Sequence, residues 1–138
     1  MEITLELLQS PKFSGPMAQH MGVKITSIEN KRAVAQLTVD ERHLRPGNIM
    51  NGGISLMLIE TVGSISSMLH INVTSQNALG LQVNANHVAV AYPGDVLTVT
   101  ADSVHLGRTT HIWDVNIINQ NNKLVSSGRI TMLVTDRK

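Results

Sequence analysis

The stretch that decides the fold is GNIMNGGISLMLIETVGSISSMLH, residues 47–70. Its large apolar side chains recur at steps of three and four residues, which is the period of an α-helix with one apolar face. These side chains are Ile54, Met57, Leu58, Val62, Ile65, Met68 and Leu69. We therefore predict one long helix from Ile54 to about His70, roughly 25 Å in length.

Most of the remaining chain alternates apolar and polar residues, which is the period of a β-strand. Residues 22–30 and 31–40 predict a hairpin that turns at Asn30 and Lys31. Its apolar face would carry Val34, Ala35, Leu37 and Val39. Four further segments rich in β-branched residues predict strands, and they span residues 77–92, 95–106, 109–119 and 123–136. Ahead of the hairpin, residues 3–10 predict a short helix, which the prolines and the glycine of residues 11–16 would end.

Together these elements predict an α+β fold, in which an antiparallel sheet curls around one long helix. The length of 138 residues is that of a single domain, residues 1–138. A strand of about ten residues at the edge of such a sheet would expose a row of unpaired backbone groups. We therefore expect edge-to-edge pairing of two subunits, and hence at least a homodimer.

Composition excludes several classes of function. The net charge is +1, the eleven Lys and Arg residues form no cluster, and only one Phe, one Trp and one Tyr are present, so we expect no nucleic-acid partner. The chain has no cysteine, so the fold needs no oxidising compartment. We find neither a signal-peptide pattern nor an apolar run of about 18 residues. These features favour a cytoplasmic protein without a membrane partner.

Glu60 is the one carboxylate inside the predicted helix. Burying a carboxylate among Leu, Ile, Val and Met side chains is costly unless the group is paired. Glu60 is therefore a candidate general base or nucleophile. The alternative is that Glu60 faces solvent on a polar stripe with Ser64 and Ser67.

Asn51, Gly52 and Gly53 come just before the helix, where the first backbone N–H groups lack partners and the helix dipole is positive. Such N–H groups could stabilise a carbonyl oxygen that becomes negative during acyl transfer. The alternative is a plain helix cap and tight turn. Gly53 and Glu60 are about 10 Å apart along the helix, too far to act on one carbonyl. If two helices run antiparallel across a dimer axis, the glycines of one chain can face the glutamate of the other.

Other candidate residues are less distinctive. The six histidines contain no i, i+4 pair and no HExxH pattern, so we expect no metal site. His87 lies in a predicted strand and is either an ordinary sheet histidine or a substrate contact. Arg108 and Thr109 lie in a turn whose cation, hydroxyls and backbone N–H groups could bind phosphate. A plain hairpin turn with an exposed arginine is the alternative.

The order of these elements, together with RPGNIMNGGISLMLIETVGS, GLQVNANHVAVAYPGD and HLGRTTHIWDVNI, resembles the hotdog-fold thioesterases. The resemblance covers about residues 15–135 and is closest to the branch of aryl-CoA, 1,4-dihydroxy-2-naphthoyl-CoA and phenylacetate-pathway thioesterases. It implies a sheet wrapped around one long helix, dimers that pair into homotetramers, and an acyl-CoA substrate with no separate cofactor. It also implies Glu60 as nucleophile or general base, Gly52 as the oxyanion donor, and Ser64 as a hydroxyl that helps to place water.

Two residues depart from the pattern of that family. Asn51 stands where the family has a histidine before the two glycines, and asparagine can cap the helix but cannot titrate. Arg45 stands where this branch often has a glutamine near the thioester, which could alter recognition of the acyl group. The strand after His87 also lacks the basic residues that some relatives use on CoA phosphates, which leaves Arg108 and Thr109 for that contact.

We therefore predict an acyl-CoA thioesterase that releases CoA and a carboxylic acid. Arg45, Gly53 and His87 would contact the substrate. The flexible side chains of Met50, Met57 and Met68 would also line the substrate pocket. The alternative is a non-catalytic protein of the same fold that binds acyl-CoA or another small ligand, and Asn51 is the residue that favours it. A hotdog dehydratase is a third possibility, but it would need a catalytic histidine that residues 51–53 do not supply.

Overall fold

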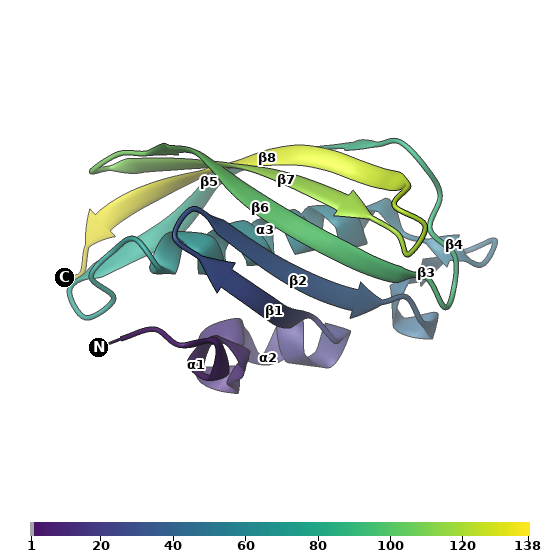
Figure 1. The fold of residues 1–138 in the computed structure, drawn as a ribbon, viewed down its shortest axis with the longest axis horizontal. Helices are drawn as coiled ribbons and strands as arrows, with labels where there is room; N and C mark the ends of the chain where they lie inside the picture. Colours follow the sequence, from purple (N-terminus) through teal and green to yellow (C-terminus); the bar gives the residue numbers. More distant parts are fainter. Residues whose placement is uncertain (1) are drawn as a thin grey trace.

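The computed structural model describes residues 2–138, which fold as a curved antiparallel sheet with one long helix against its inner face (Figure 1). The helices are α1 (Leu5–Gln9), α2 (Pro11–Met21), a 3-10 turn η1 (Glu41–His43) and α3 (Gly52–Met68). The strands of the large sheet are β1 (Lys24–Glu29), β2 (Arg32–Thr38), β5 (Gln76–His87), β6 (Val96–Leu106), β7 (Thr110–Ile118) and β8 (Leu124–Asp136). Two short strands, β3 (Leu44–Arg45) and β4 (Ile49–Met50), form a small hairpin of their own.

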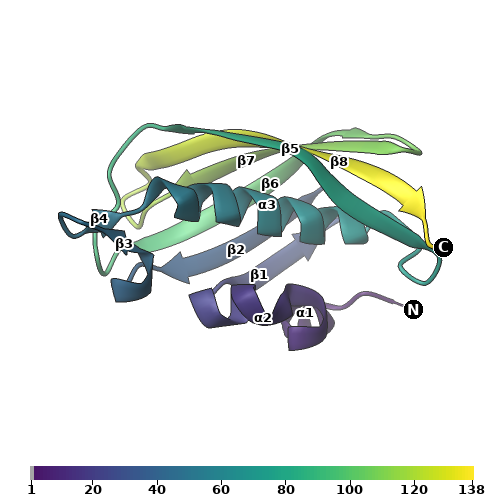
Figure 2. The same ribbon diagram turned by 180° about the vertical axis from the view of Figure 1, so that it is seen from behind.

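The large sheet has the strand order β1-β2-β6-β7-β8-β5, and each neighbouring pair is antiparallel. After β2 the chain forms α3 and then returns as β5 at the opposite edge of the sheet. Helix α3 therefore crosses beneath the strands (Figure 2). This arrangement is the hotdog fold, and the predicted fold class is confirmed. Helix α3 begins at Gly52, two residues before the predicted start, because Asn51 already caps it.

The core lies between α3 and the inner face of the sheet. Leu58, Ile59 and Val62 of the helix are fully buried, and so is Trp113 of β7. The predicted inner face of β2 needs a correction, because the buried residues are Ala33, Ala35, Leu37 and Val39, whereas Val34 is only half-buried. Period two places odd-numbered residues on one face, and the small alanines let the helix and the sheet approach closely.

Two further predictions on the elements were wrong in part. The short helix is present and ends where predicted, because α1 spans Leu5–Gln9 and Ser10 is extended, but residues 11–16 are themselves helical, since α2 runs from Pro11 to Met21. Proline is compatible with the first turn of a helix, and the backbone is non-helical only at Gly15, where α2 kinks. The predicted strand 77–92 is also shorter, because β5 ends at His87 and residues 88–92 continue without strand structure.

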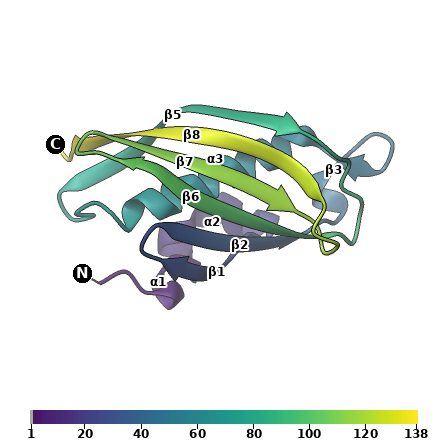
Figure 3. The same cartoon turned by 45° about the horizontal axis from the view of Figure 1, so that its top comes forward.

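The two edges of the sheet differ. At one edge, the helices α1 and α2 lie beside β1, and the Gln9 side-chain amide donates to the Ile25 carbonyl (Figure 2). At the other edge lies β5, a strand of 12 residues whose outer side pairs with no other element within residues 2–138 (Figure 3). Among the described residues, no helix is both long and apolar enough to cross a lipid bilayer.

Candidate active site

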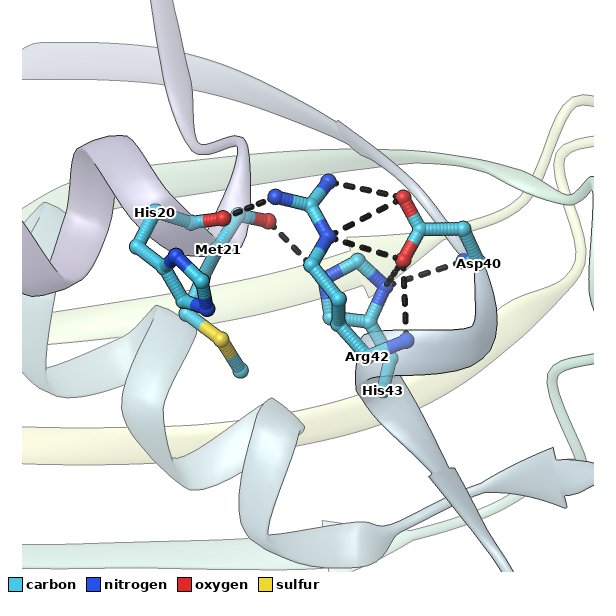
Figure 4. A network of polar contacts seen from close by, with 5 residues as sticks. All are labelled: His20, Met21, Asp40, Arg42 and His43. Carbon is cyan, nitrogen blue, oxygen red and sulfur yellow. Dashed lines mark hydrogen bonds and ion pairs between the residues drawn. The ribbon is translucent and has the colours of Figure 1, made fainter.

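The loop that leads into α3 is held by an ion pair between Asp40 and Arg42 (Figure 4). The Arg42 guanidinium donates to both carboxylate oxygens of Asp40, at 2.7–3.2 Å, and its other end donates to the His20 carbonyl of α2. These hydrogen bonds lower the pKa of Asp40 to about 2. The carboxylate therefore stays ionised over the whole neutral range and holds Arg42, which ties the loop to α2.

His43 fixes the same loop from inside the protein (Figure 4). Its side chain is fully buried, with Nε2 2.8 Å from the Met21 carbonyl and Nδ1 3.0 Å from the backbone N–H of Asp40. Nδ1 therefore accepts and Nε2 donates, as in a neutral imidazole. The His43 carbonyl in turn accepts from the backbone N–H of Asn51 at 2.8 Å. This contact connects the buried histidine to the first residue of the candidate site.

Asn51 caps α3 and leaves one backbone donor unused. The Asn51 side-chain oxygen accepts from the N–H of Gly53 at 2.8 Å, and the N–H of Ile54 donates to the Asn51 carbonyl. Within residues 2–138, no group accepts a hydrogen bond from the N–H of Gly52. The two interpretations of residues 51–53 are thus compatible, because Gly53 serves the cap while the Gly52 N–H stays available at the positive end of the helix.

His87 lies directly against Gly52. A Cβ atom on Gly52 would lie 2.7 Å from His87 Nε2, so only glycine leaves room for the imidazole at this position. The Ser126 hydroxyl donates to Ser55 Oγ at 2.8 Å and also lies 3.1 Å from His87 Nδ1, so the imidazole and the two serines form one hydrogen-bonded group.

A cavity of about 180 Å³ opens at this end of α3. Its walls include four residues of the predicted site, namely Arg45, Met50, Gly52 and His87. Ser55 and Ser126 also line it, and neither was predicted from the sequence. Ser55 lies in an apolar helix and Ser126 in an alternating strand; the register of β5 with β8 brings Ser126 opposite His87, and Ser126 in turn contacts Ser55.

Glu60 lies on the same helix, eight residues after Gly52, or about 12 Å along the axis. Its side chain is half-buried beneath Gly80 of β5, and none of the ion pairs within residues 2–138 involves it. Ser64, one turn further on, is half-buried and its hydroxyl points to the Met132 sulfur at 3.8 Å. In a single protomer, Glu60 and the Gly52 N–H are too far apart to act on one carbonyl carbon.

Several predicted substrate contacts lie away from this cavity. Arg108 and Thr109 are exposed in the turn between β6 and β7, and the Thr109 carbonyl accepts from Val134 near the end of β8. Ser126 lies near the start of β8, so the turn is roughly 26 Å from the cavity at about 3.3 Å per strand residue.

The three methionines predicted to line the substrate pocket do not all lie at this cavity either. Met57 lies on α3 and its sulfur accepts from Thr61 at 3.6 Å. Met68 lies near the other end of α3 and lines a separate cavity of about 510 Å³. Of the three methionines predicted to form the acyl pocket, the cavity at Gly52 therefore contains only Met50. No three His, Asp or Glu side chains within residues 2–138 are grouped so that they could hold a metal ion.

Comparisons with known proteins agree on one family. Residues 47–126, which include α3 and the strands β5 to β7, match the thioesterase superfamily. The chain is 33% identical over 122 residues to a 1,4-dihydroxy-2-naphthoyl-CoA hydrolase of Listeria monocytogenes, covering 88% of this chain and 98% of that protein.

Solved structures give the same result. The crystal structure of a variant of thioesterase PA1618 from Pseudomonas aeruginosa superposes with a TM-score of 0.92 at 30% identity, over 99% of this chain and 97% of that one. A hypothetical thioesterase from Streptococcus pneumoniae, solved with coenzyme A, superposes with a TM-score of 0.82 at 25% identity, over 94% and 99% of the two chains. The prediction of an enzyme of the thioester-hydrolase class is confirmed, and the chain belongs to the thioesterase superfamily.

Proposed function

We propose that this protein is an acyl-CoA thioesterase whose active site is shared between two subunits. The observation that carries this proposal is the free N–H of Gly52, which lies at the capped start of α3 beside a cavity in a member of the thioesterase superfamily. This donor would hydrogen-bond the thioester carbonyl and stabilise the negative charge that forms on its oxygen. No cofactor takes part, and coenzyme A belongs to the substrate.

Glu60 of the second subunit supplies the carboxylate. As a general base it takes a proton from water while the water oxygen bonds to the carbonyl carbon. The carbon–sulfur bond then breaks, and the proton passes to the leaving CoA thiolate. As a nucleophile, Glu60 would instead form an anhydride with the acyl group, which water then hydrolyses. Both routes release CoA and a carboxylic acid, and in both Ser64 helps to place the water.

The sharing of the site follows from distance and from the free edge of the sheet. The separation of about 12 Å along α3 rules out a site within one protomer. Strand β5 has an edge that pairs with no other element within residues 2–138. Pairing two β5 edges about a twofold axis would satisfy the backbone groups of that edge and lay two α3 helices antiparallel. Two such dimers could then pair into a tetramer.

The substrate proposal assigns the remaining predicted residues. A structural neighbour was solved with coenzyme A and a relative is named a CoA hydrolase, which supports a CoA thioester as the substrate. Arg45, Met50 and His87 would contact the thioester end, and Met57 the acyl group. Arg108 and Thr109 lie roughly 26 Å from the cavity of their own protomer, so they would reach CoA phosphates only at a neighbouring subunit's site.

The test is a spectrophotometric assay of thiol release over a panel of aryl- and alkyl-CoA thioesters. Glu60→Gln keeps the shape of the side chain and removes its charge, so kcat should fall by about 100-fold or more while KM changes little. Glu29→Gln, at an exposed position at the end of β1, is the matched control and should keep wild-type kcat. Unchanged turnover in Glu60→Gln would contradict the proposed role of this carboxylate.

A second candidate function is a binding protein that does not hydrolyse its ligand. Asn51 favours it, because the family motif has a titratable histidine at this position and asparagine cannot exchange a proton. The same panel separates the two functions. Binding of acyl-CoA, measured by calorimetry, without thiol release from any thioester would favour the binding protein.

A further inference from the structure

Gly80 of β5 lies on the inner face of the sheet, directly over Glu60. A Cβ atom built on Gly80 would overlap Glu60 Oε1 and would lie 3.1 Å from Cδ and 3.2 Å from Oε2. The carboxylate therefore occupies the space that any other residue at position 80 would fill with its own side chain. Gly80 is the only glycine of residues 2–138 whose missing side chain is replaced by a carboxylate.

The backbone does not require glycine at this position. Four glycines within residues 2–138 have a positive φ, at positions 15, 22, 47 and 94, and Gly80 is not among them. In a strand interior, glycine lowers stability because it loses more backbone entropy on folding and packs no side chain. Residue 80 lies beside an irregularity in the pairing of β5 with β8, between Gly80 and Gln82, but a bulge in ordinary β conformation accepts other residues as well. What remains as a reason for glycine is the close approach of Glu60.

We infer that Gly80 is a positioning residue for the Glu60 carboxylate. This inference rests on the proposed function, in which Glu60 reaches toward the Gly52 N–H of a second subunit. Strand β5 is the free edge of the sheet, so a carboxylate that lies under Gly80 is directed toward the edge where that subunit would pair. Any side chain at position 80 would push the carboxylate away from this edge and along the helix.

The position of the carboxylate matters because attack requires accurate placement. A displacement of about 1 Å at a reacting group can lower the rate of an enzyme by about 100-fold. The overlapping atoms belong to the end of a flexible side chain, so Gly80→Ala should fold by moving Glu60 rather than by moving the sheet. Position 80 would thus affect turnover through Glu60 without contacting the substrate.

The first experiment compares Gly80→Ala with Asn77→Ala by thiol release and by thermal unfolding. Asn77 lies on the same strand, and because Ala78 packs toward the core, the Asn77 side chain lies on the opposite face. We expect kcat of Gly80→Ala to fall by about tenfold or more, with less than about a threefold change in KM and no loss of thermal stability. Asn77→Ala should keep wild-type kcat. Wild-type kcat in Gly80→Ala would overturn the inference.

The second experiment is a rescue. Glu60→Asp shortens the side chain by one methylene group and so withdraws the carboxylate from the space that a Cβ at position 80 would occupy. The kcat of the Gly80→Ala/Glu60→Asp double variant should therefore exceed the value expected from multiplying the two single losses. Losses that simply multiply would overturn the inference. If Gly80→Ala alone does not fold, refolding in the double variant supports the inference, and continued unfolding overturns it.

These outcomes differ from a failure of the proposed function. Full activity of Glu60→Gln would remove the catalytic role of the carboxylate, whatever happens at position 80. Loss of activity in Glu60→Gln together with wild-type kcat in Gly80→Ala would remove only the role of Gly80.

Discussion

Gly52 has two properties that different substitutions can test separately. Its backbone N–H is unused within residues 2–138, and its missing side chain leaves room for His87. Position 52 is the first residue of α3, where proline is tolerated because the N–H has no partner inside the helix. Asn51 has φ −66° and ψ 131°, which is the conformation that a residue before proline prefers.

We predict that Gly52→Pro has a kcat about 100-fold or more below that of Gly52→Ala. Both variants add a Cβ that crowds His87, but only proline removes the N–H donor. The comparison therefore isolates the hydrogen bond to the thioester oxygen from the displacement of the imidazole. The measurement is kcat in the thiol-release assay, with circular dichroism to verify that α3 is intact in both variants. Equal kcat values would show that the Gly52 N–H does not stabilise the transition state.

Helix α3 supplies the candidate site with its first residues and is anchored to the sheet by its last ones. Ser67 is fully buried near the C-terminal end of the helix, where its hydroxyl accepts from Trp113 Nε1 at 2.8 Å and lies 3.1 Å from His111 Nδ1. Since Ser67 accepts from Trp113, its own proton is free to bond His111. Burial lowers the pKa of His111, which favours the neutral imidazole that can accept this proton.

We expect Ser67→Ala to lower the free energy of unfolding by about 1–3 kcal/mol, because it leaves Trp113 Nε1 and His111 Nδ1 buried without a partner. The matched control is Ser66→Ala, since Ser66 is equally buried but donates to the Val62 carbonyl one turn earlier in its own helix. Ser66→Ala should lower the free energy of unfolding clearly less, because the Val62 carbonyl can still accept from a backbone N–H of the helix. Urea denaturation measures both variants. Equal losses would contradict the role assigned to Ser67.

For the molecule as a whole, sequence periodicity was sufficient to predict the layers but not the contacts between them. Helix α3 and the β1–β2 hairpin follow from patterns within 20 residues, and so does the placement of Glu60 and Gly52 on one helix. The inner face of β2 was misassigned because Val34 is more apolar than Ala33, whereas the pleat decides which of the two is buried.

The contacts that define the site depend on strand register, which a single sequence does not reveal. His87 meets Ser126, 39 positions further along the chain, because β5 pairs with β8, and Gly80 covers Glu60 because β5 crosses α3 at that point. The prediction of a shared site has a different basis. It rests on the length of a helical turn and on the unpaired edge of a sheet, both of which can be argued before any contact is known.

That shared site leads to the prediction for the assembled protein. Glu60→Gln and Gly52→Pro should each be nearly inactive alone, because a homodimer of either variant has two altered active sites. When equal amounts are unfolded together and refolded, half of the dimers should be mixed, and each mixed dimer has one intact site and one doubly altered site. The mixture should therefore regain about a quarter of wild-type kcat per subunit. Native mass spectrometry measures the mixed dimers; if they form and activity stays at the average of the parents, Glu60 and Gly52 do not act across a subunit interface.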